Sequence, residues 1–153
     1  MRIIGLDYGE RRIGVAVGDP TGTIASPQGA IAVRKDGSHI GEIAALCESL
    51  GAERIVVGLP LHLSGAEGAS AQAARALAER LQSGVAIPVV LMDERLTTAQ
   101  AERALLSWDV SRAKRKRVID GVSAALLLDA YLGRLRGEKQ DRDEGNPGAR
   151  GEG

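Results

Sequence analysis

Four acidic residues stand where an ordinary solvated carboxylate is not expected. Asp7 ends the apolar run IIGLD, Asp93 and Glu94 end the run IPVVLMDE, and Asp120 lies early in the apolar stretch KRVIDGVSAALLL. In open α/β sheets, ligands collect beyond the carboxyl ends of the strands. The small side chain of Ala124 would let the last helix lie close enough to the sheet for Asp120 to join such a site.

Carboxylates brought together repel one another, and a divalent cation between them relieves that repulsion. Mg²⁺ and Mn²⁺ prefer hard oxygen ligands of this kind. Two such ions, about 3.5–4 Å apart, can activate a water and stabilise the leaving oxygen of a phosphodiester. The acids therefore indicate metal-dependent phosphodiester chemistry.

Each acid also has an ordinary structural explanation. Asp7 could be a turn residue, the DER segment could be a salt-bridged strand end, and Asp120 could stabilise a helix N-terminus. Strand alternation places Asp93 and Glu94 on opposite faces, so only one of them is expected to join the site. The sequence leaves open which one it is.

Basic residues form the second candidate feature. The segment RAKRKR, at 112–117, carries five positive charges, and we interpret residues 109–117 as a flexible connector that contacts phosphates without reading bases. The alternative is a solvated loop, or surface salt bridges for the isolated arginines. The candidate nucleic-acid-binding residues are Arg11, Arg12, Arg95, Arg112, Lys114, Arg115, Lys116 and Arg117.

Composition narrows the protein class. The chain has 153 residues, 44% of them hydrophobic, which fits one globular domain. No apolar run approaches the roughly 20 residues that span a membrane, and no secretion signal is evident, so a cytoplasmic protein is expected. Twenty basic and 20 acidic residues balance, unlike the charge of a strongly basic nucleic-acid binder. Two tyrosines, one tryptophan and no phenylalanine argue against a base-stacking platform.

The remaining potential metal ligands do not form a zinc pattern. His39 and His62 have no cysteine near them in sequence, and each is expected to be a surface or loop residue. The single cysteine, Cys47, lies in an apolar helical stretch and is expected to be a small core residue.

Hydrophobic periodicity predicts the elements that position these residues. Two apolar runs, at 2–9 and 12–19, suggest a hairpin, and a third, irregular strand follows at 24–33. Buried strands are predicted at 53–60 and 87–94. Helices are predicted at 38–50, with Ser38 as N-cap and Gly51 as terminator, at 69–83, at 97–108 and at 118–135. The order predicts an α/β fold with a mixed five-stranded sheet, three strands antiparallel, and helices on both faces.

With these motifs in hand, the chain resembles the YqgF/RuvX family. The resemblance rests on GLDYGERRIGVAVGDPTGTIASP, VVGLPLHLSGAEG, LMDERLTTAQAERAL and KRVIDGVSAALLLDAYL, and covers residues 1–136. It implies a ribonuclease H-like nuclease domain at 1–136, followed by a tail at 137–153 that we expect to be disordered. Family members are described as Holliday-junction resolvases or as nucleases that process the 5′ end of pre-16S rRNA.

By this resemblance, Asp7, Glu94 and Asp120 are the catalytic metal ligands, with Asp93 as the alternative to Glu94. The wider ribonuclease H-like superfamily commonly has an acid at the end of the fourth strand, whereas here that strand ends VVGLP. The resemblance implies that the DER acid takes its place. The implied cofactor is Mg²⁺ or Mn²⁺, as one ion or two.

The predicted function is hydrolysis of structured RNA or branched DNA by a monomer or homodimer. The missing fourth-strand acid supports one alternative, a non-catalytic nucleic-acid-binding module. A second alternative is an actin-like nucleotide-binding protein, because GLDYG followed by GVAVGD resembles the phosphate hairpin of that class. The chain is too short for the second domain that such proteins use.

Overall fold

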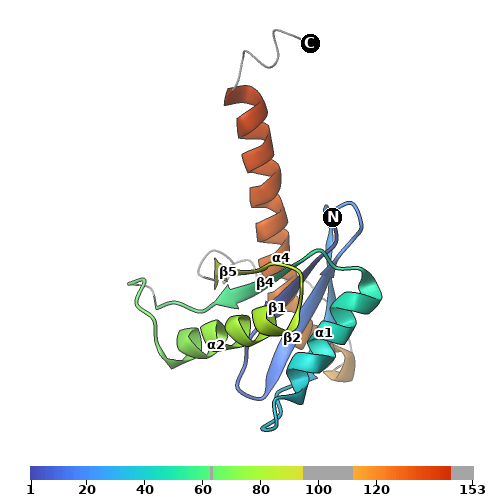
Figure 1. Ribbon diagram of the computed structural model, residues 1–153, viewed down its shortest axis with the longest axis vertical. Coiled ribbons are helices and arrows are strands. Elements are labelled where there is room, and N and C mark those ends of the chain that lie inside the picture. Colours follow the sequence, from blue (N-terminus) through green and yellow to red (C-terminus); the bar gives the residue numbers. More distant parts are fainter. Residues whose placement is uncertain (63, 95–111, 146–153) are drawn as a thin grey trace.

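Five strands form one mixed sheet in the computed structural model of this protein (Figure 1), in the order β3-β2-β1-β4-β5. The structure describes residues 1–62, 64–94 and 112–145, with backbone alone for 112–120 and 139–145. The first three strands pair antiparallel, while β1–β4 and β4–β5 pair parallel. The mixed sheet predicted from the sequence is confirmed. The strands are β1 (Ile3–Asp7), β2 (Arg12–Gly18), β3 (Ala25–Ala32), β4 (Arg54–Leu59) and β5 (Val89–Asp93).

The register brings the carboxyl ends of the parallel strands to one edge of the sheet. Leu6 of β1 pairs with Val57 of β4, so Asp7 comes next to Gly58. Gly58 pairs in turn with Met92 of β5. Asp7, Gly58 and Met92 thus lie side by side across the three strands. Asp93 and Glu94, which follow Met92, lie just beyond this row.

Helices cover both faces of the sheet, as predicted. Helices α1 (Ser38–Leu50) and α2 (Ala69–Gly84) lie on one face, and α4 (Arg112–Gly145) lies on the other (Figure 1). Alternate strand residues point to the two sides: Ile4 and Leu6 join the core under α1 and α2, whereas Ile3 joins the core under α4. Fully buried aliphatic side chains on both faces hold the strand ends in place.

Glycines allow α4 to pack directly on the backbone of the sheet. A Cβ atom at Gly5 would lie 3.0 Å from Cβ of Leu128 and 3.1 Å from the carbonyl oxygen of Ala124. One at Gly121 would lie 2.8 Å from Cβ of Pro27 in β3. Such distances are tighter than ordinary side-chain packing permits, so the helix and sheet are closer here than larger residues would allow.

The same contacts give the direction of α4. Leu128 lies near both Gly18 and Gly5, and Ala124, one turn earlier, lies over Gly5. Further along the helix, Asp129 accepts a hydrogen bond of 3.1 Å from the backbone N–H of Ala25, which pairs with Gly18. The helix thus runs antiparallel to β1, and its N-terminal turns approach the edge at which Asp7 lies.

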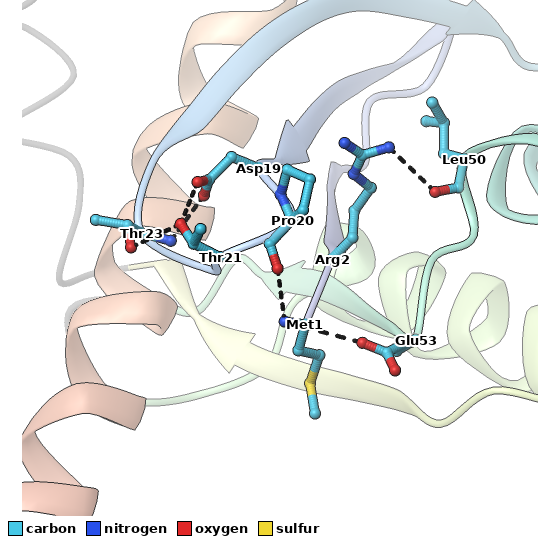
Figure 2. Close-up of polar contacts among 8 residues, drawn as sticks. All are labelled: Met1, Arg2, Asp19, Pro20, Thr21, Thr23, Leu50 and Glu53. Carbon is cyan, nitrogen blue, oxygen red and sulfur yellow. Dashed lines mark hydrogen bonds and ion pairs between the residues drawn. The ribbon is translucent and has the colours of Figure 1, made fainter.

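At the opposite edge, hydrogen bonds and an ion pair join the first residues of the chain to two neighbouring segments (Figure 2). The amino group of Met1 donates a 2.8 Å hydrogen bond to the carbonyl of Pro20 and lies 3.9 Å from a carboxylate oxygen of Glu53. Arg2 donates to the carbonyl of Leu50 over 3.2 Å. These contacts fasten the start of β1 to the turn after β2 and to the segment that leads into β4.

The turn after β2 is organised by Asp19. Its carboxylate accepts hydrogen bonds from the backbone N–H groups of Thr23, at 2.7 Å, and Ile24, at 2.9 Å, and from the hydroxyl of Thr21. Figure 2 shows the threonines gathered around this carboxylate. The hydrogen bonds lower the pKa of Asp19, with that from Ile24 having the largest effect.

Two local predictions for α1 are wrong. The N-cap is Gly37, in the left-handed conformation with φ 77°, and Ser38 is the first helical residue. Asp36 accepts a 2.9 Å hydrogen bond from the Ser38 N–H instead. His39, predicted at the surface, is buried, and its Nδ1 accepts a 3.1 Å bond from the backbone N–H of Arg34.

Other predictions for this region are confirmed. Gly51 terminates α1 with φ 63°, and Cys47 is buried in the core, where burial raises the pKa of its thiol to about 11. His62 is exposed, as predicted.

The last helix is longer than the sequence analysis predicts. Residues 112–117 were expected in a flexible connector, but the backbone is helical from Arg112. The tail expected to be disordered from residue 137 is helical as far as Gly145, and its last residues, 146–153, lie outside the described part. The helix predicted at 97–108 also lies outside the described residues. Within the described ranges, no helix has an apolar stretch long enough to cross a membrane.

Candidate active site

Asp7 is held at the edge of the sheet by the strand before it and the turn after it. The four preceding residues of β1 are buried, and Tyr8 packs against the core under α1 and α2. A Cβ atom at Gly9 would lie 2.6 Å from the carbonyl oxygen of Arg12, so the turn into β2 requires glycine. Asp7 itself is partly buried.

Glu94 lies on the same face of the sheet as Asp7. Val90 and Met92 of β5 pack in the core under α4, while Leu91 packs in the core on the opposite face. Continuing this alternation directs Glu94 toward the α4 side and Asp93 away from it. Ile3 and Gly5 of β1 also face α4, and two residues further on the same holds for Asp7.

Gly58 lies between the two acids and leaves room for the Glu94 side chain. A Cβ atom at position 58 would lie 2.8 Å from both Cγ and Cδ of Glu94, and closer still to Oε1. The Glu94 side chain therefore crosses the end of β4 in the space that the side chain of any residue other than glycine at position 58 would occupy. No motif of the sequence pointed to Gly58. It does stand at the end of the fourth strand, where the wider superfamily commonly has an acid, and this replacement by glycine could have drawn attention to it.

The carboxyl groups of Glu94 and Asp7 lie within hydrogen-bonding reach of each other. Two carboxyl groups can share a hydrogen bond only when one is protonated. Burial, followed by this hydrogen bond and the charges of Asp7 and Asp93, raises the pKa of Glu94 from its ordinary 4.5 to about 9. A cation bound between the two carboxyl groups would offset the charge repulsion that contributes to this shift.

Asp120 is the third predicted acid, and the structure describes only its backbone. It lies in α4 directly before Gly121, which contacts β3, and one turn before Ala124, which covers Gly5. Since α4 runs antiparallel to β1, this backbone position lies toward the Asp7 end of the strand. The described side chains alone include no group of three potential metal ligands, and the side chain of Asp120 is not among them.

The predicted basic residues are described to different extents. Arg11, in the turn that follows Asp7, and Arg12, the first residue of β2, are exposed at the same edge of the sheet. Arg95 lies outside the described residues. Residues 112–117 occupy the first turns of α4, and only their backbone is described.

A family model for RuvX, described as a Holliday junction resolvase, matches residues 1–134. The chain belongs to this family. A relative from Moorella thermoacetica, named "Putative pre-16S rRNA nuclease", is 45% identical over 135 residues, covering 88% of this chain and 96% of its own. A relative of the same name from Pelotomaculum thermopropionicum is 42% identical over 151 residues, covering 96% of this chain and 98% of its own.

Solved structures support the ribonuclease H-like fold. Thermus thermophilus RuvC, in complex with a Holliday junction substrate, aligns with a TM-score of 0.53 at 17% identity over 88% of this chain and 96% of its own. The fowlpox virus resolvase, in complex with Holliday junction DNA, aligns with a TM-score of 0.54 at 11% identity over 88% of this chain and 99% of its own. At these identities the likeness concerns the fold alone.

Proposed function

We propose that this RuvX family member is a metal-dependent nuclease that hydrolyses phosphodiester bonds in structured nucleic acid. The observation that carries the proposal is the pair of carboxyl groups, Asp7 and Glu94, on one face of the sheet at its carboxyl edge. The names of its relatives, which describe nucleases and resolvases, support the same reaction.

The acids fit a divalent metal site. Asp7 and Glu94 offer hard oxygen donors, and Asp120 would supply a third from α4. Burial has the largest effect in raising the pKa of Glu94, and a cation would offset the further contribution from the charges of Asp7 and Asp93. Asp93 is the weaker alternative, because alternation along β5 directs it toward the other face. Mg²⁺ or Mn²⁺, once bound, would supply Lewis-acid activation of water and of the phosphodiester.

The chain's own groups then bind and orient the substrate. Arg11, in the turn after Asp7, and Arg12, at the start of β2, are exposed at the edge where Asp7 lies and would contact phosphates of the bound nucleic acid. The basic first turns of α4, from Arg112 to Arg117, and Arg95 would extend this contact. Because such contacts involve phosphates, selectivity would come from the shape of the nucleic acid.

The substrate is either the 5′ leader of pre-16S rRNA or branched DNA such as a four-way junction. A protein that cuts a junction symmetrically benefits from a two-fold axis and would act as a homodimer, whereas end processing of RNA can proceed with a monomer. We assign the nuclease domain to residues 1–136 and the cytoplasm as its location.

The alternative, a binding module without catalysis, loses its main support. That support was the absence of an acid at the end of the fourth strand. Glu94 brings a carboxyl group to this place from β5, across Gly58.

Asp7→Asn tests the proposal. Its amide keeps the size of the side chain but removes a charged metal ligand, so we expect cleavage to fall by at least about a thousandfold, or ~4 kcal/mol in activation free energy. Single-turnover cleavage of a four-way junction and of a pre-16S rRNA leader should be measured in Mg²⁺ and in Mn²⁺. Fluorescence anisotropy should show that both proteins bind the preferred substrate with similar affinity.

The matched control is Glu48→Gln, which changes an exposed acid in the last turn of α1, beside Leu50, whose carbonyl bonds Arg2 at the opposite edge of the sheet. It should cleave as the wild type does. Metal-dependent cleavage that persists in purified Asp7→Asn contradicts the proposal, and substrate binding without cleavage by the wild type favours the binding module.

A further inference from the structure

A single residue, Gly58, separates the two acids of the candidate site. The register of β1, β4 and β5 places it in one row with Asp7 and Met92, on the face covered by α4. Glu94 lies two residues beyond Met92 on that face, so its side chain must pass over β4 to reach Asp7. It does so directly above Gly58, with Cγ and Cδ both 2.8 Å from the place of a Cβ atom.

A methyl group at this place cannot coexist with the Glu94 side chain in its present position. Contacts of Cβ atoms with other heavy atoms below 3.0 Å are essentially never found, so one group must move. The backbone of β4 is held on both sides by strand pairing, whereas Glu94 is a flexible side chain beyond the end of β5. The side chain would therefore swing away from Asp7 while the sheet stays intact.

We propose that Gly58 is a positioning residue whose missing side chain allows Glu94 to supply, from β5, the carboxyl group that β4 itself lacks. This rests on the proposed function of the Asp7–Glu94 pair and adds a specific requirement to it. Gly58 acts only through Glu94, and any side chain at position 58 separates the two acids.

A double-mutant cycle tests this dependence. Gly58→Ala, Glu94→Ala and the double variant are compared with the wild type by Mn²⁺ titration calorimetry and by single-turnover cleavage. Gly58→Ala should weaken Mn²⁺ binding by at least about tenfold in the wild-type background, as expected when the support of a metal ligand is lost. In the Glu94→Ala background, the same substitution should change Mn²⁺ affinity and cleavage by less than about twofold, because the group it displaces is gone.

Gly41→Ala is the matched control for replacing a glycine. A Cβ atom at Gly41, in α1, meets no other atom within 4 Å, so Mn²⁺ affinity should equal that of the wild type. Thermal unfolding in EDTA should show that Gly58→Ala remains folded, with a midpoint within roughly 3 °C of the wild type. Equal losses from Gly58→Ala in both backgrounds, or no loss in the wild-type background, overturn the proposal.

A crystal structure of metal-free Gly58→Ala gives a readout that needs neither metal nor activity. The Glu94 carboxyl should have left Asp7, and a retained Asp7–Glu94 hydrogen bond overturns the proposal. If the wild type cleaves nothing but Glu94 moves in this way, the nuclease function fails and the positioning role stands. If the wild type cleaves and Gly58→Ala cleaves equally well, the nuclease function stands and the positioning role fails.

Discussion

Asp19 and Glu94 lie at opposite edges of the same sheet, and their surroundings shift their pKa values in opposite directions. Asp19 is exposed, and three hydrogen-bond donors of its own turn surround its carboxylate. Glu94 is partly buried against a second carboxyl group. The first pKa is lowered and the second is raised to about 9.

The difference separates a structural acid from a candidate catalytic one. The donors around Asp19 are already within the fold, so its charge needs no external partner. At the Asp7–Glu94 pair, the fold places two carboxyl groups side by side in a partly buried position, an arrangement typical of functional sites. Replacing each acid by its amide should therefore have opposite consequences.

Among the substitutions that compare these acids, Glu94→Gln should have the largest effect. It removes a charged metal ligand and should lower single-turnover cleavage by roughly a hundredfold or more, about 2.7 kcal/mol in activation free energy. Stability without metal should not fall, because the substitution also removes repulsion from Asp7 and Asp93. Asp93→Asn, on the opposite face, should retain most of the activity. The reverse ranking of these two variants would make Asp93 the ligand.

The pH dependence of stability should follow the raised pKa of Glu94. A carboxyl group whose pKa is higher in the folded state stabilises the protein when protonated in both states. This contribution is complete below pH 4.5 and is lost as pH rises toward about 9. Urea unfolding in EDTA across this range should show a wild-type decline that Glu94→Gln removes. Parallel curves for the two proteins would contradict the assignment, and saturating Mn²⁺ should reduce the decline.

The smallest effect is expected for Asp19→Asn. The amide cannot accept all the hydrogen bonds that the carboxylate accepts in its turn, so the midpoint of thermal unfolding should decrease modestly while cleavage by the folded protein stays unchanged. Because the pKa of Asp19 is lowered, its contribution is present above its ordinary value of 3.8 and is lost as pH falls below it. If Asp19→Asn lost cleavage while keeping wild-type stability, Asp19 would no longer count as a purely structural acid in contrast to Glu94.

Much of the fold could be predicted from the sequence because the apolar runs are long and clearly bounded. The hairpin, the parallel strands and the placement of Asp7 at a strand end follow from alternation and turn residues. Alternation also separated Asp93 from Glu94. Our preference for Glu94 over Asp93 rests on which face α4 covers, and that depends on contacts between Gly5, Ala124 and Leu128, far apart in the sequence.

The errors come from features in which local preferences compete. The segment 112–117 is strongly charged, which suggested a loop, yet alanine, lysine and arginine are also good helix formers, and the backbone is helical. Ser38 is a good N-cap by type, but Gly37 adopts the left-handed conformation that begins the helix. His39 is buried because the N–H of Arg34 provides a hydrogen-bond partner that no periodicity reveals.

The glycine contacts beneath α4 have a consequence for how this site could be altered. The separation between Asp7 and the backbone of Asp120 depends on how closely α4 packs on the sheet at Gly5 and Gly121. Neither glycine belongs to the group of acids itself. A methyl group at Gly5 would act as a spacer under the helix, lifting its first turns from β1 while leaving every acid in the sequence unchanged. In the proposed metal site, the spacing of the acids would thus be altered from the helix–sheet interface, without replacing an acid.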